Sequence, residues 1–172
     1  MNRRKVLQTL GLLPAVLATR SALASDVDFS GPLTWRKYEE AMKLAATDNK
    51  MICLVVFAQW CPHCKELGPM FKDAEVVKAA KNLHLVNQDS ELRPAWLLQR
   101  YSRLGAYIPR IHFLRPDGSV VEEITSGNPK FPYFYQGADV AALRTSFQRA
   151  LLQMNPNSHA APHAPAPHKT KG

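Results

Sequence analysis

Hydrophobic and polar positions along the chain follow two different periods. Residues 51–57 form a continuous apolar run rich in β-branched side chains, and residues 83–89 begin in the same way, as expected of strands buried in a sheet. Two shorter runs, 111–114 and 120–124, flank Pro116-Asp117-Gly118, a sequence typical of a hairpin turn. In four other segments apolar residues recur every three or four positions, which predicts amphipathic helices. These segments are 34–48, 65–81, 94–103 and 138–153.

Local signals suggest where these helices begin, bend and end. Thr34 is a candidate N-cap for the first helix, and Gly105 is a candidate stop for the third. Pro69 lies inside the second helix, where its missing N–H predicts a kink. The order helix, strand, helix, strand, helix, strand, strand, helix predicts an α/β fold: a mixed central sheet with helices on both faces.

The N-terminus has the composition of an export signal. Arg3-Arg4-Lys5 precedes a short apolar stretch, and Ala22-Leu23-Ala24 is a small-residue cleavage site, so residues 1–24 are predicted to be removed. Asn2-Arg3-Arg4 also resembles a twin-arginine signal, and an ordinary secretory signal stays open as the alternative. The apolar stretch is too short and too interrupted for a good membrane span. We therefore expect a periplasmic or otherwise exported protein with no stable membrane span after cleavage.

The rest of the chain divides into three parts. Residues 25–32 form a lead segment, residues 33–153 form one domain, and residues 154–172 form a tail of Pro, Ala and His that is predicted to be disordered. The formal charge is +8, from 22 basic and 14 acidic residues. Loss of the signal removes Arg3, Arg4, Lys5 and Arg20, which leaves 18 against 14, or +4. With no basic stripe among aromatic residues, a nucleic-acid partner is not expected.

The candidate chemistry lies in Trp60-Cys61-Pro62-His63-Cys64, between the first predicted strand and the second predicted helix. Two thiols at this spacing can close and open a disulfide reversibly. A helix N-terminus carries partial positive charge and unpaired N–H groups, which favour a thiolate. Pro62 suits the first helical turn, and His63 adds a possible positive charge beside Cys61. Stabilising the thiolate stabilises the reduced form, so the disulfide is expected to be a strong oxidant.

The two cysteines are expected to have different roles. Cys61 attacks as a thiolate and forms a mixed disulfide, which Cys64, one turn into the helix and more buried, resolves. No cofactor is expected beyond this redox-active disulfide. Cys53, inside the apolar strand, is expected to be a buried apolar residue rather than a third redox partner. A zinc site is not expected, because the folded region lacks a second Cys or Cys/His pair at ligand spacing.

Taken together, these motifs resemble the thioredoxin fold. In that family a strand ends in Trp-Cys-x-x-Cys-Lys, and an Ile-Pro, here Ile108-Pro109, precedes a later strand. The resemblance implies that this proline is cis and lies against the redox pair, where its neighbours pair with the client backbone. The segment from Tyr107 to Gly118, together with Asn128-Pro129 and Tyr133-Phe134-Tyr135, resembles the small endoplasmic-reticulum thioredoxin-like proteins that include the anterior gradient group. This resemblance covers roughly residues 33–152. The Cys-Pro-His-Cys tetrad itself is similar to that of the periplasmic DsbA oxidants. The resemblance implies disulfide exchange with exported protein clients and with a redox partner protein.

One position departs from the family pattern. Many thioredoxin-like enzymes place a buried acid six residues before the first cysteine, where it accepts the proton of the resolving thiol, and here that position is Val55. Glu66 and Asp89 are candidates for the same role through a bridging water. Without the usual acid, we expect a slow resolving step.

Several alternatives stay open on the sequence alone. The first concerns the direction of disulfide exchange. A His in the tetrad favours oxidation or isomerisation, but the sequence is also compatible with a periplasmic reductase fed by a membrane electron donor. A copper-handling protein is another, with Cys61 and Cys64 as soft thiolate ligands. It would use the tail histidines, which are His159, His163 and His168. His112 is expected to be structural, and the aromatic residues from Phe131 to Tyr135 either pack over the last helix or dock clients.

Overall fold

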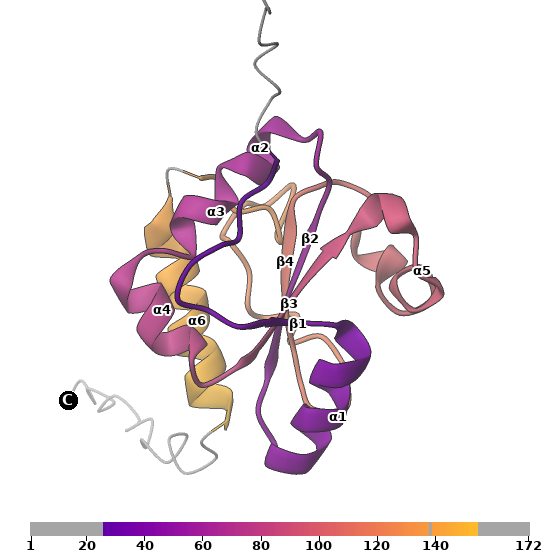
Figure 1. Cartoon of the computed structure of the whole chain (residues 1–172), viewed down its shortest axis with the longest axis vertical. Helices are drawn as coiled ribbons and strands as arrows, with labels where there is room; N and C mark the ends of the chain where they lie inside the picture. Colours follow the sequence, from indigo (N-terminus) through magenta and orange to yellow (C-terminus); the bar gives the residue numbers. More distant parts are fainter. Residues whose placement is uncertain (1–25, 138, 155–172) are drawn as a thin grey trace, which may run out of the picture.

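A computed structural model describes residues 26–137 and 139–154, and a four-stranded mixed sheet lies at its centre (Figure 1). Its strands are β1 (Trp35–Arg36), β2 (Ile52–Phe57), β3 (His84–Asp89) and β4 (Arg110–Leu114), in the order β1-β3-β2-β4. The first three are parallel to one another, and β4 runs antiparallel to β2. All six side chains of β2 are buried, since this strand is central and both of its faces are covered.

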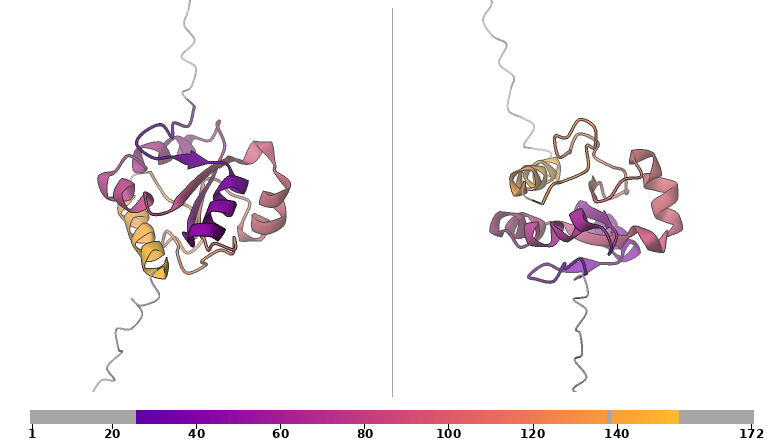
Figure 2. Two further views of the ribbon diagram at one scale, coloured as in Figure 1. Left: turned by 60° about the horizontal axis from the view of Figure 1, so that its bottom comes forward. Right: turned by 90° about the horizontal axis from the view of Figure 1, so that it is seen from above.

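Helices cover both faces of the sheet (Figures 1 and 2). On one face, α1 (Tyr38–Asp48) and α5 (Ala95–Tyr101) pack over Leu54, Val56 and Val86. On the other face, α4 (Ala74–Ala80) and α6 (Val140–Met154) enclose a larger core around Val55 and Phe113. Two short 3-10 helices, η1 (Ser90–Leu92) and η2 (Ser102–Leu104), flank α5. The predicted α/β arrangement with helices on both faces is confirmed.

The predicted strands 51–57 and 83–89 are close to β2 and β3, but the first helix starts later than predicted. Trp35 and Arg36 form β1 beside β3, and α1 begins after Lys37, so Thr34 is not its N-cap. Trp35 instead packs its ring against Phe29 and Phe71, with centroids 4.9 and 5.0 Å away. Pairing with β3 and aromatic packing therefore place Trp35 in a strand, although its spacing from the later apolar residues predicts a helix.

The second predicted helix, 65–81, is three helices rather than one kinked helix. They are α2 (Pro62–Lys65), α3 (Leu67–Met70) and α4. Pro69 cannot donate a backbone hydrogen bond, and Asp73 then adopts an extended conformation and caps α4 by accepting from the N–H groups of Glu75 and Val76. The break turns α4 so that it packs along α6.

The hairpin prediction is half right. The turn at Pro116–Gly118 forms, with Gly118 at φ +81°, but residues 120–124 are not a strand. Only an isolated bridge joins Leu114 to Val120, and the chain then turns so that Val121 and Ile124 both enter the core. Burying these two side chains stabilises the fold more than a longer pairing with β4 would. The predicted helix stop at Gly105 is confirmed, at φ +117° after η2.

Two predictions fall outside the described part of the chain, the export signal at residues 1–24 and the tail beyond Met154. Within residues 26–137 and 139–154, no helix combines the length and apolar character needed to cross a membrane. The lead segment is described from Asp26 onward, and it packs onto the domain: Val27 is buried and Phe29 lies against the core.

Candidate redox site

The redox pair lies where β2 leaves the sheet and α2 begins. Cys61 is the N-cap of α2, and its Sγ accepts the backbone N–H of Cys64 at 3.3 Å. Pro62 occupies the first helical turn, where its missing N–H leaves no partner unsatisfied. Both cysteines are free thiols, and Cys61 is 3% exposed while Cys64 is fully buried. Both thiols are thus buried, and Cys64 is the deeper of the two by a small margin.

Burial controls the chemistry of Cys64. It is the main reason why the pKa of this thiol is raised to about 12, and the hydrogen bond with Cys61 and the negative charges of Cys61 and Asp89 act in the same direction. A thiol with this pKa is almost entirely protonated at neutral pH. Its proton must therefore be removed before Cys64 can attack a mixed disulfide on Cys61.

Residues from three parts of the chain enclose the pair. Val27 of the lead segment and Phe57 and Ala58 at the end of β2 form one buried cluster with the two cysteines, and Ile108 packs against it. The Ile108-Pro109 bond is cis, as the resemblance implied. The sequence reasoning missed Val27. The alternation of Val27 and Phe29 with polar residues was the available signal, since it is typical of a segment with one face against a core.

The other two predicted supporting residues lie on the surface. Trp60 is 66% exposed, immediately before Cys61. His63 is also exposed, and its Nδ1 lies 3.7 Å from Oε2 of Glu66. Its ring packs edge-on against Phe134, with centroids 5.5 Å apart. The imidazole therefore faces solvent rather than the core.

A hollow of about 450 Å³ adjoins this side of the redox pair. Its walls come from the redox helix, the segment before the cis-proline and the aromatic loop, and they are His63, Tyr107, Ile108, Asn128, Phe131, Phe134 and Gln136. The loop is held in place, because Asn128 accepts the N–H groups of Lys130 and Phe131, and the Tyr107 hydroxyl accepts the N–H of Tyr133. Of the two interpretations of residues 131–135, packing holds for buried Tyr133 and Tyr135, whereas Phe131 and Phe134 line the hollow.

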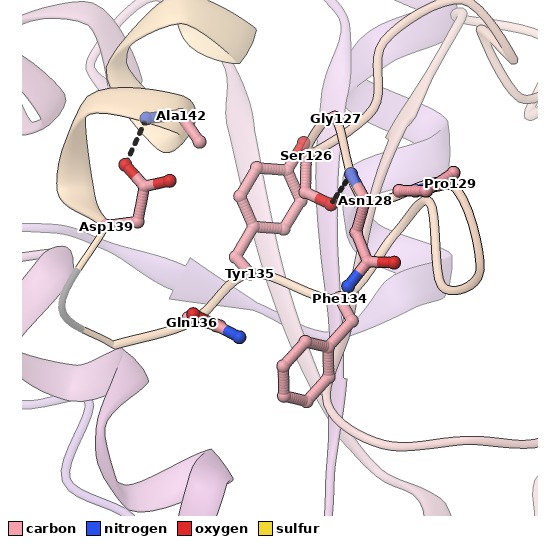
Figure 3. A pocket seen from close by; sticks show the side chains of 9 residues that line it. All are labelled: Ser126, Gly127, Asn128, Pro129, Phe134, Tyr135, Gln136, Asp139 and Ala142. Atoms are coloured by element: carbon pink, nitrogen blue, oxygen red, sulfur yellow. Dashed lines mark hydrogen bonds between the residues drawn. The ribbon is translucent and has the colours of Figure 1, made fainter.

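A second hollow, of about 330 Å³, shares Asn128, Phe134 and Gln136 with the first (Figure 3). It lies between the loop and the start of α6, where Asp139 caps the helix by accepting the N–H of Ala142. Phe134 therefore stands between two hollows, and only the first reaches the redox helix.

An apolar side chain occupies the position where many thioredoxin-like enzymes have a buried acid. Val55 is fully buried in the middle of β2, with Asn87 beside it on β3 and Ile111 beside it on β4. The two candidate acids are placed differently. Glu66 is exposed and faces His63, whereas Asp89 ends β3 directly beside Phe57, and its charge acts on Cys64.

The remaining titratable candidates are structural. Cys53 is fully buried in β2, and burial raises the pKa of its thiol far above the ordinary range. Burial also lowers the pKa of His112 to about 3, so this side chain is neutral, with its ring 4.5 Å from that of Tyr133. Across residues 26–137 and 139–154 no three His, Cys, Asp or Glu side chains are grouped as they would be around a metal ion.

Comparisons with known proteins identify relatives of the chain. A family model described as Thioredoxin-like matches residues 34–116. The human protein "Anterior gradient protein 2 homolog" is 33% identical over 121 residues, which cover 69% of this chain and 67% of the relative. The mouse protein "Anterior gradient protein 3" is 28% identical over 125 residues, covering 69% of this chain and 72% of the relative.

Solved structures agree on the fold. A thioredoxin from Thermus thermophilus superposes with a TM-score of 0.56 at 17% identity, covering 76% of this chain and 98% of that protein. A structure described as DsbH Oxidoreductase superposes with a TM-score of 0.50 at 18% identity, covering 83% of this chain and 95% of that protein. With a cysteine pair at the start of α2 and a cis Ile108-Pro109 bond whose Ile108 packs against that pair, the chain belongs to the thioredoxin-like family and is a thiol-disulfide oxidoreductase.

Proposed function

We propose that this protein exchanges disulfides with exported protein clients through Cys61 and Cys64, on the oxidising or isomerising side. The single observation that carries the direction is the position of His63. It lies between the two cysteines in the chain, in the first turn of α2, and its side chain is exposed. An imidazolium at this position favours the thiolate, and hence the reduced form of the pair, so the disulfide readily oxidises a client.

Protein clients are favoured by the surface around Cys61. Trp60 is exposed on one side, and on the other the hollow of about 450 Å³ has aromatic walls and two side-chain amides. Apolar surface next to a reactive thiol suits an extended polypeptide, whose backbone the amides of Asn128 and Gln136 can hydrogen-bond. The predicted signal at residues 1–24 supports export, and oxidising compartments outside the cytoplasm are where disulfide exchange operates.

The reduction potential of the Cys61–Cys64 pair is the decisive measurement. We expect equilibration with glutathione to give a value between about −180 and −120 mV, the range of disulfide isomerases and strong oxidants. A value near −270 mV, the potential of thioredoxin, would contradict the proposal and favour a reductase fed by a membrane electron donor.

Single cysteine variants test the division of roles. Cys61→Ser should abolish exchange, because it removes the attacking thiol. Cys64→Ser should still attack and should accumulate mixed disulfides with clients, which are detected as bands that disappear on reduction. Exchange at the wild-type rate by Cys61→Ser would mean that another thiol performs the attack.

A further inference from the structure

The resolving cysteine needs a base that the core does not supply at the usual position. Cys64 is fully buried and protonated, and Val55 occupies the strand position of the usual acid. Proton removal by a positioned side chain, directly or through one water, accelerates such steps by about 10²- to 10⁴-fold. The question is which group near Cys64 can accept this proton.

The sheet register points to the end of β3. Phe57 pairs with Asp89 across the parallel ladder, as Val55 pairs with Asn87 two residues earlier. Paired residues on neighbouring strands project to the same face of the sheet, so Asp89 lies on the face of Val55 and Phe57. Phe57 shares a buried cluster with Cys61 and Cys64. Compared with an acid at position 55, the carboxylate of Asp89 therefore lies on the neighbouring strand β3. It is also two residues further along the sheet toward the redox pair.

Asp89 is also accessible to water. The short strand β1 pairs with β3 only at Leu85 and Val86, so the last residues of β3 lie at an open edge of the sheet. Asp89 is partly exposed there, and its Oδ1 accepts the N–H of Glu91 at 2.9 Å, which fixes the carboxylate. Its charge also acts on Cys64, since it is among the causes that raise the pKa of that thiol.

Glu66, the other candidate, is engaged elsewhere. It is about half exposed and lies against His63 rather than against Cys64. The apolar side chains around the pair are Val27, Phe57 and Ala58, with Phe29 and Ile108 packed against them. The charges of Cys61 and Asp89 both act on the resolving thiol, and Asp89 is the carboxylate of the two.

We propose that Asp89 is the positioning residue that accepts the Cys64 proton through a bridging water. This inference rests on the proposed disulfide exchange. The Cys64 proton passes to Asp89, the Cys64 thiolate attacks Cys61 Sγ, and a Cys61–Cys64 bond forms. The bond from Cys61 to the client breaks, and the client sulfur leaves with the electron pair. In the oxidising direction the same steps run in reverse: a client thiolate attacks Cys61, Cys64 leaves as a thiolate, and Asp89 returns the proton.

Stopped-flow reaction of the reduced protein with Ellman's reagent separates attack from resolution. The first thionitrobenzoate is released when Cys61 attacks, and the second when Cys64 displaces it from Cys61. In Asp89→Asn the first phase should be unchanged, because Cys61 is untouched and Asn keeps an oxygen to cap Glu91. The second phase should slow at least tenfold at pH 7. The two proteins should converge at high pH, as the pKa of Cys64, about 12, is approached.

Chemical rescue separates a proton acceptor from a structural residue. Added formate or imidazole should accelerate the second phase of Asp89→Asn and leave the wild type unchanged. Glu91→Gln removes a neighbouring exposed charge and serves as the matched control, with a second phase within twofold of the wild type. Asp89→Glu, which keeps a carboxylate, should retain more of the rate than Asn and provides a second variant.

The outcomes distinguish this inference from the function on which it rests. If Asp89→Asn resolves at the wild-type rate from pH 6 to 9, or if Glu91→Gln slows the second phase equally, the role of Asp89 is wrong while disulfide exchange stands. The same holds if added bases do not rescue the variant. A wild-type protein that never releases the second thionitrobenzoate would instead contradict the proposed function itself.

Discussion

Two exposed side chains flank Cys61 in the sequence, Trp60 and His63. His63 is exposed, faces Glu66 at 3.7 Å and packs edge-on against Phe134, so its orientation is fixed from two sides. Trp60, the residue before Cys61, is 66% exposed. Cys61 is thus preceded in the chain by an exposed indole and followed, two residues later, by an exposed imidazole.

His63→Ala should make the pair less oxidising. Loss of the imidazolium removes an interaction with the thiolate, which destabilises the reduced form and lowers the reduction potential. A tenfold change in the equilibrium constant with glutathione, on the order of 30 mV, is expected. His63→Lys keeps a positive charge and is the control, with a potential closer to that of the wild type. An unchanged potential in His63→Ala would mean that the helix N-terminus alone stabilises the thiolate.

Val55→Asp would restore an acid to the strand position where the family often has one. The new carboxyl would be fully buried, so we expect a loss of about 2–4 kcal/mol in the free energy of unfolding. If the folded protein is recovered, the second phase with Ellman's reagent should be at least as fast as in the wild type. Denaturant unfolding and stopped-flow measurements check the two effects. Val55→Asn is the control, with a similar loss of stability and no gain in rate.

At the scale of elements, close backbone approach holds the lead segment against the redox helices. A Cβ on Gly68 of α3 would overlap the carbonyl oxygen of Asp28. The same segment carries Val27 into the cysteine cluster and places Phe29 against the rings of Trp35 and Phe57. Glycine at position 68 is therefore what allows the lead segment to cover the buried side of the redox pair.

Gly68→Ala should loosen this cover. The methyl group forces the segment away from α3, and overpacking of this kind costs about 1–3 kcal/mol. We expect a lower denaturation midpoint and faster alkylation of the two cysteines in the native protein. Lys72→Ala breaks only the exposed ion pair with Asp28 and should change neither measurement appreciably. Equal alkylation rates in Gly68→Ala and the wild type would show that the lead segment does not protect the thiols.

The sequence predicts elements well where their signals are local and poorly where packing decides. The run of β-branched residues identifies β2, and Pro62 with the flanking cysteines marks the start of α2. The separation of α3 from α4 depends on Asp73, which caps α4 in an extended conformation after α3 has ended at Met70. The short β1 and the missing strand at 120–124 depend on partners far along the chain, which no local pattern shows.

The functional site, like the fold, is predictable only where its signals are local. Cys61, Cys64 and the cis-proline follow from motifs, whereas Val27 and the walls of the hollow come from segments that only the fold brings together. Position 55 illustrates this difference between sequence and structure. The sequence shows that the usual acid is absent, but only the register of β2 and β3 shows that Asp89 lies on the same face.

At the scale of the whole molecule, carboxylates tie separate segments together. Asp73 caps α4 and accepts two hydrogen bonds from Arg144 of α6, which hold its pKa at about 2. Lys72 also lowers the pKa of Asp28, but this ion pair is exposed and contributes little to stability. A carboxyl with a depressed pKa in the folded state stabilises the protein above its usual value of 3.8. That contribution disappears as the pH falls through the folded-state pKa.

Acid should therefore destabilise the protein between about pH 4 and pH 2, with Asp73 as a main contributor. The melting temperature should be flat above pH 5 and fall steeply below pH 4. In Asp73→Asn the melting temperature should be lower at pH 6, and the difference from the wild type should close toward pH 2, where Asp73 becomes protonated. Arg144→Met tests the partner: the double variant should lose less than the sum of the two single variants, because both remove one interaction. A difference that stays constant from pH 6 to pH 2 would assign the role of Asp73 to helix capping alone, with no contribution from its charge.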